Sequence, residues 1–116
     1  MDTCVQIPRS LVEGLRAQGL TWLQIARQLR RRYGIPALVA ARAAHGWSRT
    51  EVAQAWNERW PDEDKSFKNL QYWEAWPGPA GYPPALPDLI RLAELYQMAA
   101  SDLLESVSGQ SVTATR

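Results

Sequence analysis

The chain has 116 residues and a mass of 13.1 kDa, a length typical of one domain that can bury a hydrophobic core. Its formal net charge of +1 is too small to indicate nucleic-acid binding by itself, so only local patches of positive charge can indicate it. Cys4 is the only cysteine, which excludes an intramolecular disulfide and favours a reducing, cytoplasmic location. The start of the chain lacks the features of a signal peptide, and no apolar run is long enough to predict a membrane span.

Residues 1–35 are predicted to contain a helical hairpin. A first helix from Ser10 to Gln18 is expected to end at Gly19, because glycine tolerates the left-handed conformation that closes helices. Thr21 and Gln24 then fit the capping box that begins a second helix. The apolar residues of this helix recur at helical spacing, and they are Trp22, Ile25, Ala26, Leu29 and Tyr33. This stripe either packs on the rest of the chain or pairs two chains into a homodimer.

The pattern of glycine, cap and helix at residues 19–29 recurs at residues 46–56. An alanine-rich helix over residues 36–45 precedes Gly46, and Ser48 with Glu51 forms a second capping box. The helix that follows is expected to turn Val52 and Trp56 inward. The recurrence indicates either an internal duplication or the ordinary requirements of two tight helix–turn–helix units.

A helix is predicted from Ser66 to Trp76. Ser66 is a favourable N-cap, and Leu70 and Trp73 form one apolar stripe, with Trp76 beyond them. The other side carries polar and aromatic residues, namely Phe67, Lys68, Asn69, Gln71 and Tyr72. Such a helix fits either the major groove of DNA or, equally well, the surface of any globular protein.

The last part of the chain is predicted to be helical after a proline-rich loop at residues 77–84. Leu89, Leu92 and Tyr96 mark one amphipathic helix, and a short helix near Ser101 is expected to turn Leu103 and Leu104 inward. Residues 106–116 have little to bury and are predicted to be a flexible tail. No stretch alternates at the period of a strand, so the predicted fold class is all-α.

Together, these elements resemble the Cro/repressor-type (XRE) helix-turn-helix family of transcriptional regulators. The motifs that carry the resemblance are Leu38-x-x-x-Arg42-x-x-x-Gly46-Trp47-Ser48-x-x-Glu51-Val52-Ala53, Ser66-x-x-x-Leu70-x-x-Trp73-Glu74, and Pro84-x-Leu86-x-x-Leu89-x-x-Leu92-Ala93-x-Leu95, ending in Asp102-Leu103-Leu104. The resemblance implies a lambda-repressor-like five-helix domain over residues 36–105, preceded by the hairpin of residues 1–35. Residues 58–64 are an insertion where the family has a tight turn.

The resemblance also implies roles for individual residues. The helix after Ser48 would be the positioning helix, which orients the protein on DNA. The helix Ser66–Trp76 would be the recognition helix, which contacts bases in the major groove of double-stranded DNA. The expected base contacts are Phe67, Lys68, Asn69, Gln71 and Tyr72. The expected phosphate contacts are Arg49 and Ser66, with Arg30 and Arg31 added from the arginine-rich run of residues 27–32. Arg42 and Glu74 are expected to form a structural ion pair.

A second function remains open at this point: a protein-interaction module that keeps the scaffold and regulates a partner protein without reading DNA. The low net charge and the acidic residues of the insertion favour this alternative. We expect no enzyme, since no nucleophile motif or phosphate-binding loop is present. We likewise expect no cofactor and no metal. His45 ends a helix, where we expect the helix dipole to favour its charged form.

Overall fold

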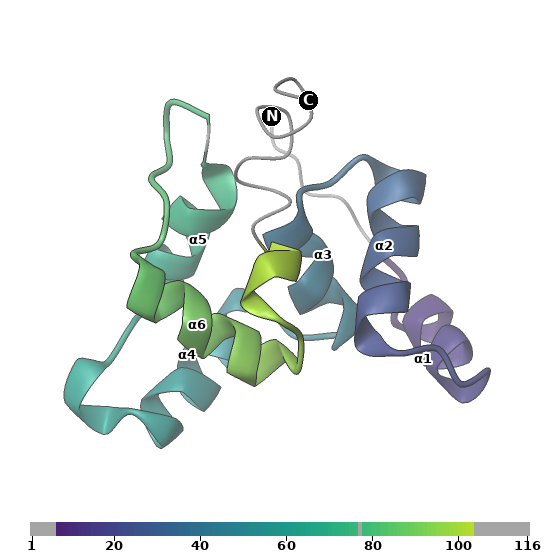
Figure 1. Cartoon of the computed structure of the whole chain (residues 1–116), viewed down its shortest axis with the longest axis horizontal. Helices are drawn as coiled ribbons and strands as arrows, with labels where there is room; N and C mark the ends of the chain where they lie inside the picture. Colours follow the sequence, from purple (N-terminus) through teal and green to yellow (C-terminus); the bar gives the residue numbers. More distant parts are fainter. Residues whose placement is uncertain (1–6, 77, 104–116) are drawn as a thin grey trace.

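The computed structural model describes residues 7–76 and 78–103, and the regular secondary structure in these residues is entirely helical (Figure 1). The predicted all-α fold class is therefore confirmed for this part of the chain. A further helical turn covers residues 100–103. The elements in chain order are α1 (Arg9–Ala17), α2 (Trp22–Tyr33), α3 (Ala37–Ala44), α4 (Arg49–Arg59), the 3-10 turn η1 (Pro61–Glu63), α5 (Phe67–Ala75) and α6 (Leu86–Tyr96).

Local sequence signals set most of these helix boundaries. The capping box at Thr21 is formed, because its N–H donates to Gln24 Oε1 at 2.8 Å and Gln24 N–H donates to Thr21 Oγ1 at 3.1 Å. Ser48 and Glu51 form the second predicted box in the same way. Gly46 has a φ of +71°, a left-handed value that side chains with a Cβ rarely adopt, so the chain turns there between α3 and α4.

Helix α3 lies between two hydrophobic cores and contributes to both. Leu38 and Ala41 face a main core shared with α4, α5 and α6, whereas Ala40 and Ala44 face a hairpin core shared with α1 and α2. The small side chains of α3 let its neighbours approach closely on two sides. In Figure 1, α2 and α5 accordingly lie on opposite sides of α3.

The two cores differ in the size of their residues. The main core contains large aromatic and aliphatic side chains, among them Trp56, Leu70, Trp73, Leu92, Tyr96 and Leu103. The hairpin core is smaller and mostly aliphatic, with Val12, Ile25, Ala26, Leu29 and Ile35. Met98 contacts both cores and helps to join them.

The apolar stripe of α2 packs within the chain. Ile25, Ala26 and Leu29 are buried against α1 and α3, so this stripe is not an exposed surface for pairing two chains. The predicted inward position of Leu103 is confirmed, whereas Leu104, Cys4 and the predicted tail of residues 106–116 lie outside the described residues. Among the described helices, none is both long enough and apolar enough to cross a membrane.

Candidate functional site

Helix α5 has one buried side and one side open to solvent. Leu70, Trp73 and Glu74 are buried against the main core. On the opposite side, Phe67 and Tyr72 keep 46% and 39% of their surface exposed. Lys68 and Gln71 are exposed beside them. Four of the five residues predicted as base contacts therefore share one accessible face.

The fifth residue, Asn69, is engaged at the start of its own helix. The backbone N–H of Ser66 donates to Asn69 Oδ1 at 3.0 Å, and the Ser66 hydroxyl lies 3.4 Å from the same oxygen. The amide oxygen of Asn69 thus satisfies a backbone donor that would otherwise lack a partner. Asn69 is only partly exposed, while Ser66 is exposed at the N-terminus of α5.

A buried carboxylate links α5 to two other helices. Arg42 from α3 donates from Nε to Glu74 Oε2 at 2.7 Å and from Nη2 to Oε1 at 3.0 Å. Arg49 from α4 donates from Nε to Glu74 Oε1 at 2.9 Å. Burial alone would lower the pKa of Arg42, but its hydrogen bonds to Glu74 and the negative charge of Glu74 raise that pKa above the usual value. The ion pair implied by the resemblance is present, and it has a third member.

Arg49 stands at the edge of this cluster rather than inside it. Its side chain is 40% exposed, against 2% for Glu74. Nε donates to Glu74, and the two terminal nitrogens make no hydrogen bond to any described residue. Arg49 is the first residue of α4 and lines the same cleft as Gln71 of α5, so it can still donate to an anion there.

The other predicted phosphate contacts are in a different place. Arg30 and Arg31 belong to α2, which is separated from α5 by α3 (Figure 1). Arg30 is partly buried and donates from Nε to the carbonyl of Ile35 at 3.4 Å, whereas Arg31 is exposed. The structure therefore brings Arg49 and Ser66 next to the α5 face, but not the arginine-rich run of α2.

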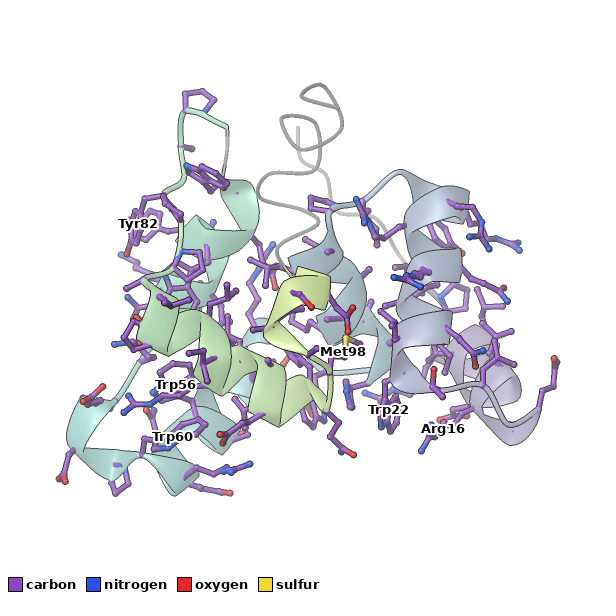
Figure 2. The ribbon with its side chains drawn as sticks, in the orientation of Figure 1. Arg16, Trp22, Trp56, Trp60, Tyr82 and Met98 are labelled. Carbon is purple, nitrogen blue, oxygen red and sulfur yellow. The ribbon has the colours of Figure 1, made fainter. Side chains whose placement is uncertain are left out.

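The insertion between α4 and α5 is fastened at several points. Trp56 Nε1 donates to the carbonyl of Glu63 at 2.8 Å. Asn57 and Lys65 exchange two hydrogen bonds, from Asn57 Nδ2 to Lys65 O at 2.9 Å and from Lys65 N to Asn57 Oδ1 at 2.7 Å. Arg91 from α6 pairs with Glu63 and lies over the rings of Trp56 and Trp60, which Figure 2 shows side by side at this end of the molecule.

The loop after α5 folds back onto the C-terminus of that helix. The N–H of Tyr82 donates to the carbonyl of Tyr72 at 3.2 Å, and the two phenol rings lie 5.2 Å apart. Gly81 allows this approach, because a Cβ at that position would come within 2.4 Å of the carbonyl oxygen of Tyr72. Tyr82, labelled in Figure 2, therefore restrains Tyr72 on the open face of α5.

His45 is part of an aromatic stack that joins the hairpin to the main core. Its ring lies 3.9 Å from that of Trp22 and 4.6 Å from that of Trp47. Arg16 lies over the ring of Trp22 (Figure 2). His45 Nε2 lies 2.8 Å from the carbonyl of Tyr96, so this nitrogen carries the proton in the neutral ring. Burial, with a contribution from Arg16, lowers the pKa of His45. His45 is partly exposed at the C-terminal end of α3, and the expected contribution of the helix dipole stays a prediction, while desolvation is the largest effect on this pKa.

Known proteins offer no comparison for this arrangement. The sequence matched no protein-family model and no curated protein, and the structure matched no solved structure. Within residues 7–76 and 78–103, no group of three or more metal-ligating side chains is close enough to hold a metal ion. The candidate site is therefore defined by its own geometry, the open face of α5 with Arg49 and Ser66 beside it.

Proposed function

We propose that the chain is a transcriptional regulator that binds double-stranded DNA by placing α5 in the major groove. The observation that carries this proposal is the two-sidedness of α5. Its buried side is fixed by Leu70, Trp73 and the carboxylate of Glu74, while the other side offers donors, acceptors and rings to solvent. A major groove admits one α-helix whose outward side chains contact base edges.

The exposed residues have the chemistry for base recognition. Lys68 can donate to O6 and N7 of guanine, and the amide of Gln71 can pair with adenine through two hydrogen bonds. Phe67 can pack on the methyl group of thymine. Tyr72 is oriented by its contact with Tyr82, which reduces the entropy lost on binding. The amide oxygen of Asn69 is already used, so we assign Asn69 mainly to capping α5.

Contacts to the DNA backbone come from the edge of the same face. Arg49 keeps its terminal nitrogens for a phosphate, and exposed Ser66 stands at a helix N-terminus, where anions are favoured. Few such groups adjoin α5, so we expect modest non-specific affinity with a shallow dependence on salt. Arg30 and Arg31 would add to it only if the DNA extended past α3 toward α2.

One observation favours the alternative, a module that binds a partner protein. The exposed large apolar residues of the described chain are Phe67, Tyr72, Tyr82, Leu86 and Ile90, which are drawn from α5, the following loop and α6. Exposed aromatic residues of this kind are enriched at protein interfaces. The exposed acidic residues of the insertion would also be better tolerated by a protein partner than by phosphates, and they are Glu58, Asp62, Glu63 and Asp64.

A selection of bound duplexes from a random DNA library separates the two functions. If α5 reads DNA, the intact protein should enrich a defined sequence. Gln71→Glu should abolish that enrichment, because it places a carboxylate against the groove. Gln28→Glu is the matched control, since it adds the same charge on the exposed side of α2. Failure of the folded protein to enrich any sequence at low salt would refute DNA reading and leave the partner-binding function.

A further inference from the structure

A cleft lies between the hairpin and α5, and Val39, Arg42 and Ala43 of α3 line it. Its volume is about 820 Å³, within the range of pockets that take small organic ligands. Residues from α1, the link between α2 and α3, α3, the start of α4, and α5 contribute to its walls. The cleft thus adjoins the candidate site, because Arg49 and Gln71 belong to both.

The walls of this cleft differ in chemistry. On the hairpin side the lining is apolar, with Val12, Ile35 and Val39. On the other side it is polar, with Arg49 and Gln71 next to the ion-pair cluster. Arg9 also lines the cleft, at the start of α1. A ligand that fills the cleft therefore needs an apolar body with one polar end.

The charges of the lining select the sign of that polar end. The carboxylate of Glu51 accepts from the N–H of Ser48, and both oxygens of Glu74 accept from arginines, so the acidic groups already have donors. Arg49 retains its terminal nitrogens, and Arg9 donates to the carbonyl of Gly46. Three arginines line the cleft against two glutamates, so its charged side chains carry a net positive charge, which complements an anion.

We propose that this cleft binds a small organic anion with an apolar body, such as a medium-chain or aromatic carboxylate or sulfonate. The anionic group lies between Arg9 and Arg49, and the apolar body packs on Val12, Ile35 and Val39. One consequence rests on the proposed function: an anion on Arg49 occupies the donor that a DNA phosphate would use, so ligand and DNA compete.

The test uses the intact protein and the fluorescent anion 8-anilinonaphthalene-1-sulfonate. We expect saturable binding of one dye per chain and displacement of the dye by decanoate. Arg9→Gln should weaken dye binding roughly tenfold, the effect of losing one charge-assisted hydrogen bond. Val39→Glu should weaken it at least as much, because it puts a carboxylate on the apolar wall. Thermal unfolding of both variants checks that they remain folded.

Two matched controls make the result specific to the cleft. Arg32→Gln removes an exposed arginine of α2, and Ile90→Glu adds a carboxylate to an exposed apolar position of α6. Both should leave dye binding unchanged. The proposal is overturned if the intact protein does not bind the dye, or if it binds the dye only after residues 1–6 are removed. It is also overturned if folded Val39→Glu still binds the dye, or if Ile90→Glu does not. Because this test contains no DNA, its outcome is independent of whether α5 reads DNA.

Discussion

The two sides of α3 are stabilised in different ways. On the α5 side, directional contacts supplement a core of large residues: Arg42 and Arg49 meet Glu74, and Asn57 clamps Lys65. On the hairpin side, aliphatic residues pack on α1 and α2, and the stack of Trp22 on His45 adds an aromatic contact to the rest of the chain. The comparison indicates that buried ion pairs orient α5, whereas apolar and aromatic packing holds the hairpin. This is the difference expected if α5 must present a defined face to a partner.

The largest expected effect comes from removing the shared carboxylate. Glu74→Ala should lower the free energy of unfolding by about 3–5 kcal/mol, because it leaves the guanidinium of Arg42 buried without its partner. Adding Arg42→Ala should recover part of that loss. Glu94→Ala is the control, since its pair with Arg59 is exposed and should contribute about 0–1 kcal/mol. Denaturant unfolding measures all of these variants, and equal losses for Glu74→Ala and Glu94→Ala would contradict the role given to the buried cluster.

A matched pair of leucines tests whether the two cores unfold together. Leu29 in the hairpin core and Leu92 in the main core are each 1% exposed. Leu29→Ala and Leu92→Ala should each cost about 2–5 kcal/mol, from lost burial and the cavity left behind. Because α3 belongs to both cores, each variant should still unfold in one transition, with tryptophan fluorescence and circular dichroism coinciding. Two separate transitions in Leu29→Ala would show that the hairpin is an independent unit.

The clamp on the insertion should contribute less. Asn57→Ala removes two hydrogen bonds to the backbone of Lys65 and should cost about 1–3 kcal/mol. We expect amide hydrogen exchange to increase in residues 60–65, with little change in the hairpin. Asn57→Asp keeps the acceptor and loses the donor, so it should have an intermediate effect. Unchanged exchange in Asn57→Ala would mean that Trp56 and Arg91 suffice to fix the insertion.

The smallest predicted effect concerns pH and the hairpin side. The pKa of His45 is lowered, so the folded chain binds a proton less readily than the unfolded chain, whose histidine titrates near 6.5. Stability from this group is therefore complete above pH 6.5 and falls as the pH drops from there toward the lower folded pKa, by at most about 1.4 kcal/mol per pH unit. Tyr96 faces the same ring, and burial raises the pKa of its phenol, so it stays neutral in this window, while Arg16 lies over the neighbouring ring of Trp22. Comparing unfolding of the protein and of His45→Gln between pH 7.5 and 5 checks this, and identical slopes would contradict it.

The sequence predicted those features that depend on neighbours along the chain. The caps at Thr21 and Ser48 and the glycine turns follow from local backbone chemistry, and helical periodicity identified the inward faces of α2 and α6. Arg42 and Glu74 were paired only through the family resemblance. Their partner Arg49 was predicted solely as a phosphate contact, because spacing along the chain does not show that α4 brings it to Glu74.

Features built from distant residues were not predictable in this way. The clamp between Asn57 and Lys65 depends on the path of the insertion, for which the sequence contains no periodic signal. The stack on His45 joins Trp22, Trp47 and Tyr96 from three parts of the chain. The residues next to His45 in the sequence indicate only that it ends a helix, so they do not predict this stack. Asn69 was predicted as a base contact because it lies among polar residues, although its position three residues after Ser66 also suits a cap.

The most direct test of the central claim is the base preference of a lysine variant on the duplex selected by the intact protein. Lys68→Ala should lose about 1–3 kcal/mol of binding free energy and relax the preference at one or two adjacent base pairs. Lys65→Ala is the matched control, because its amine lies over the ring of Trp56 rather than on the open face of α5. It should leave the preference at every base pair unchanged. A Lys68→Ala variant that keeps the full preference at each base pair would contradict the claim that the open face of α5 reads DNA.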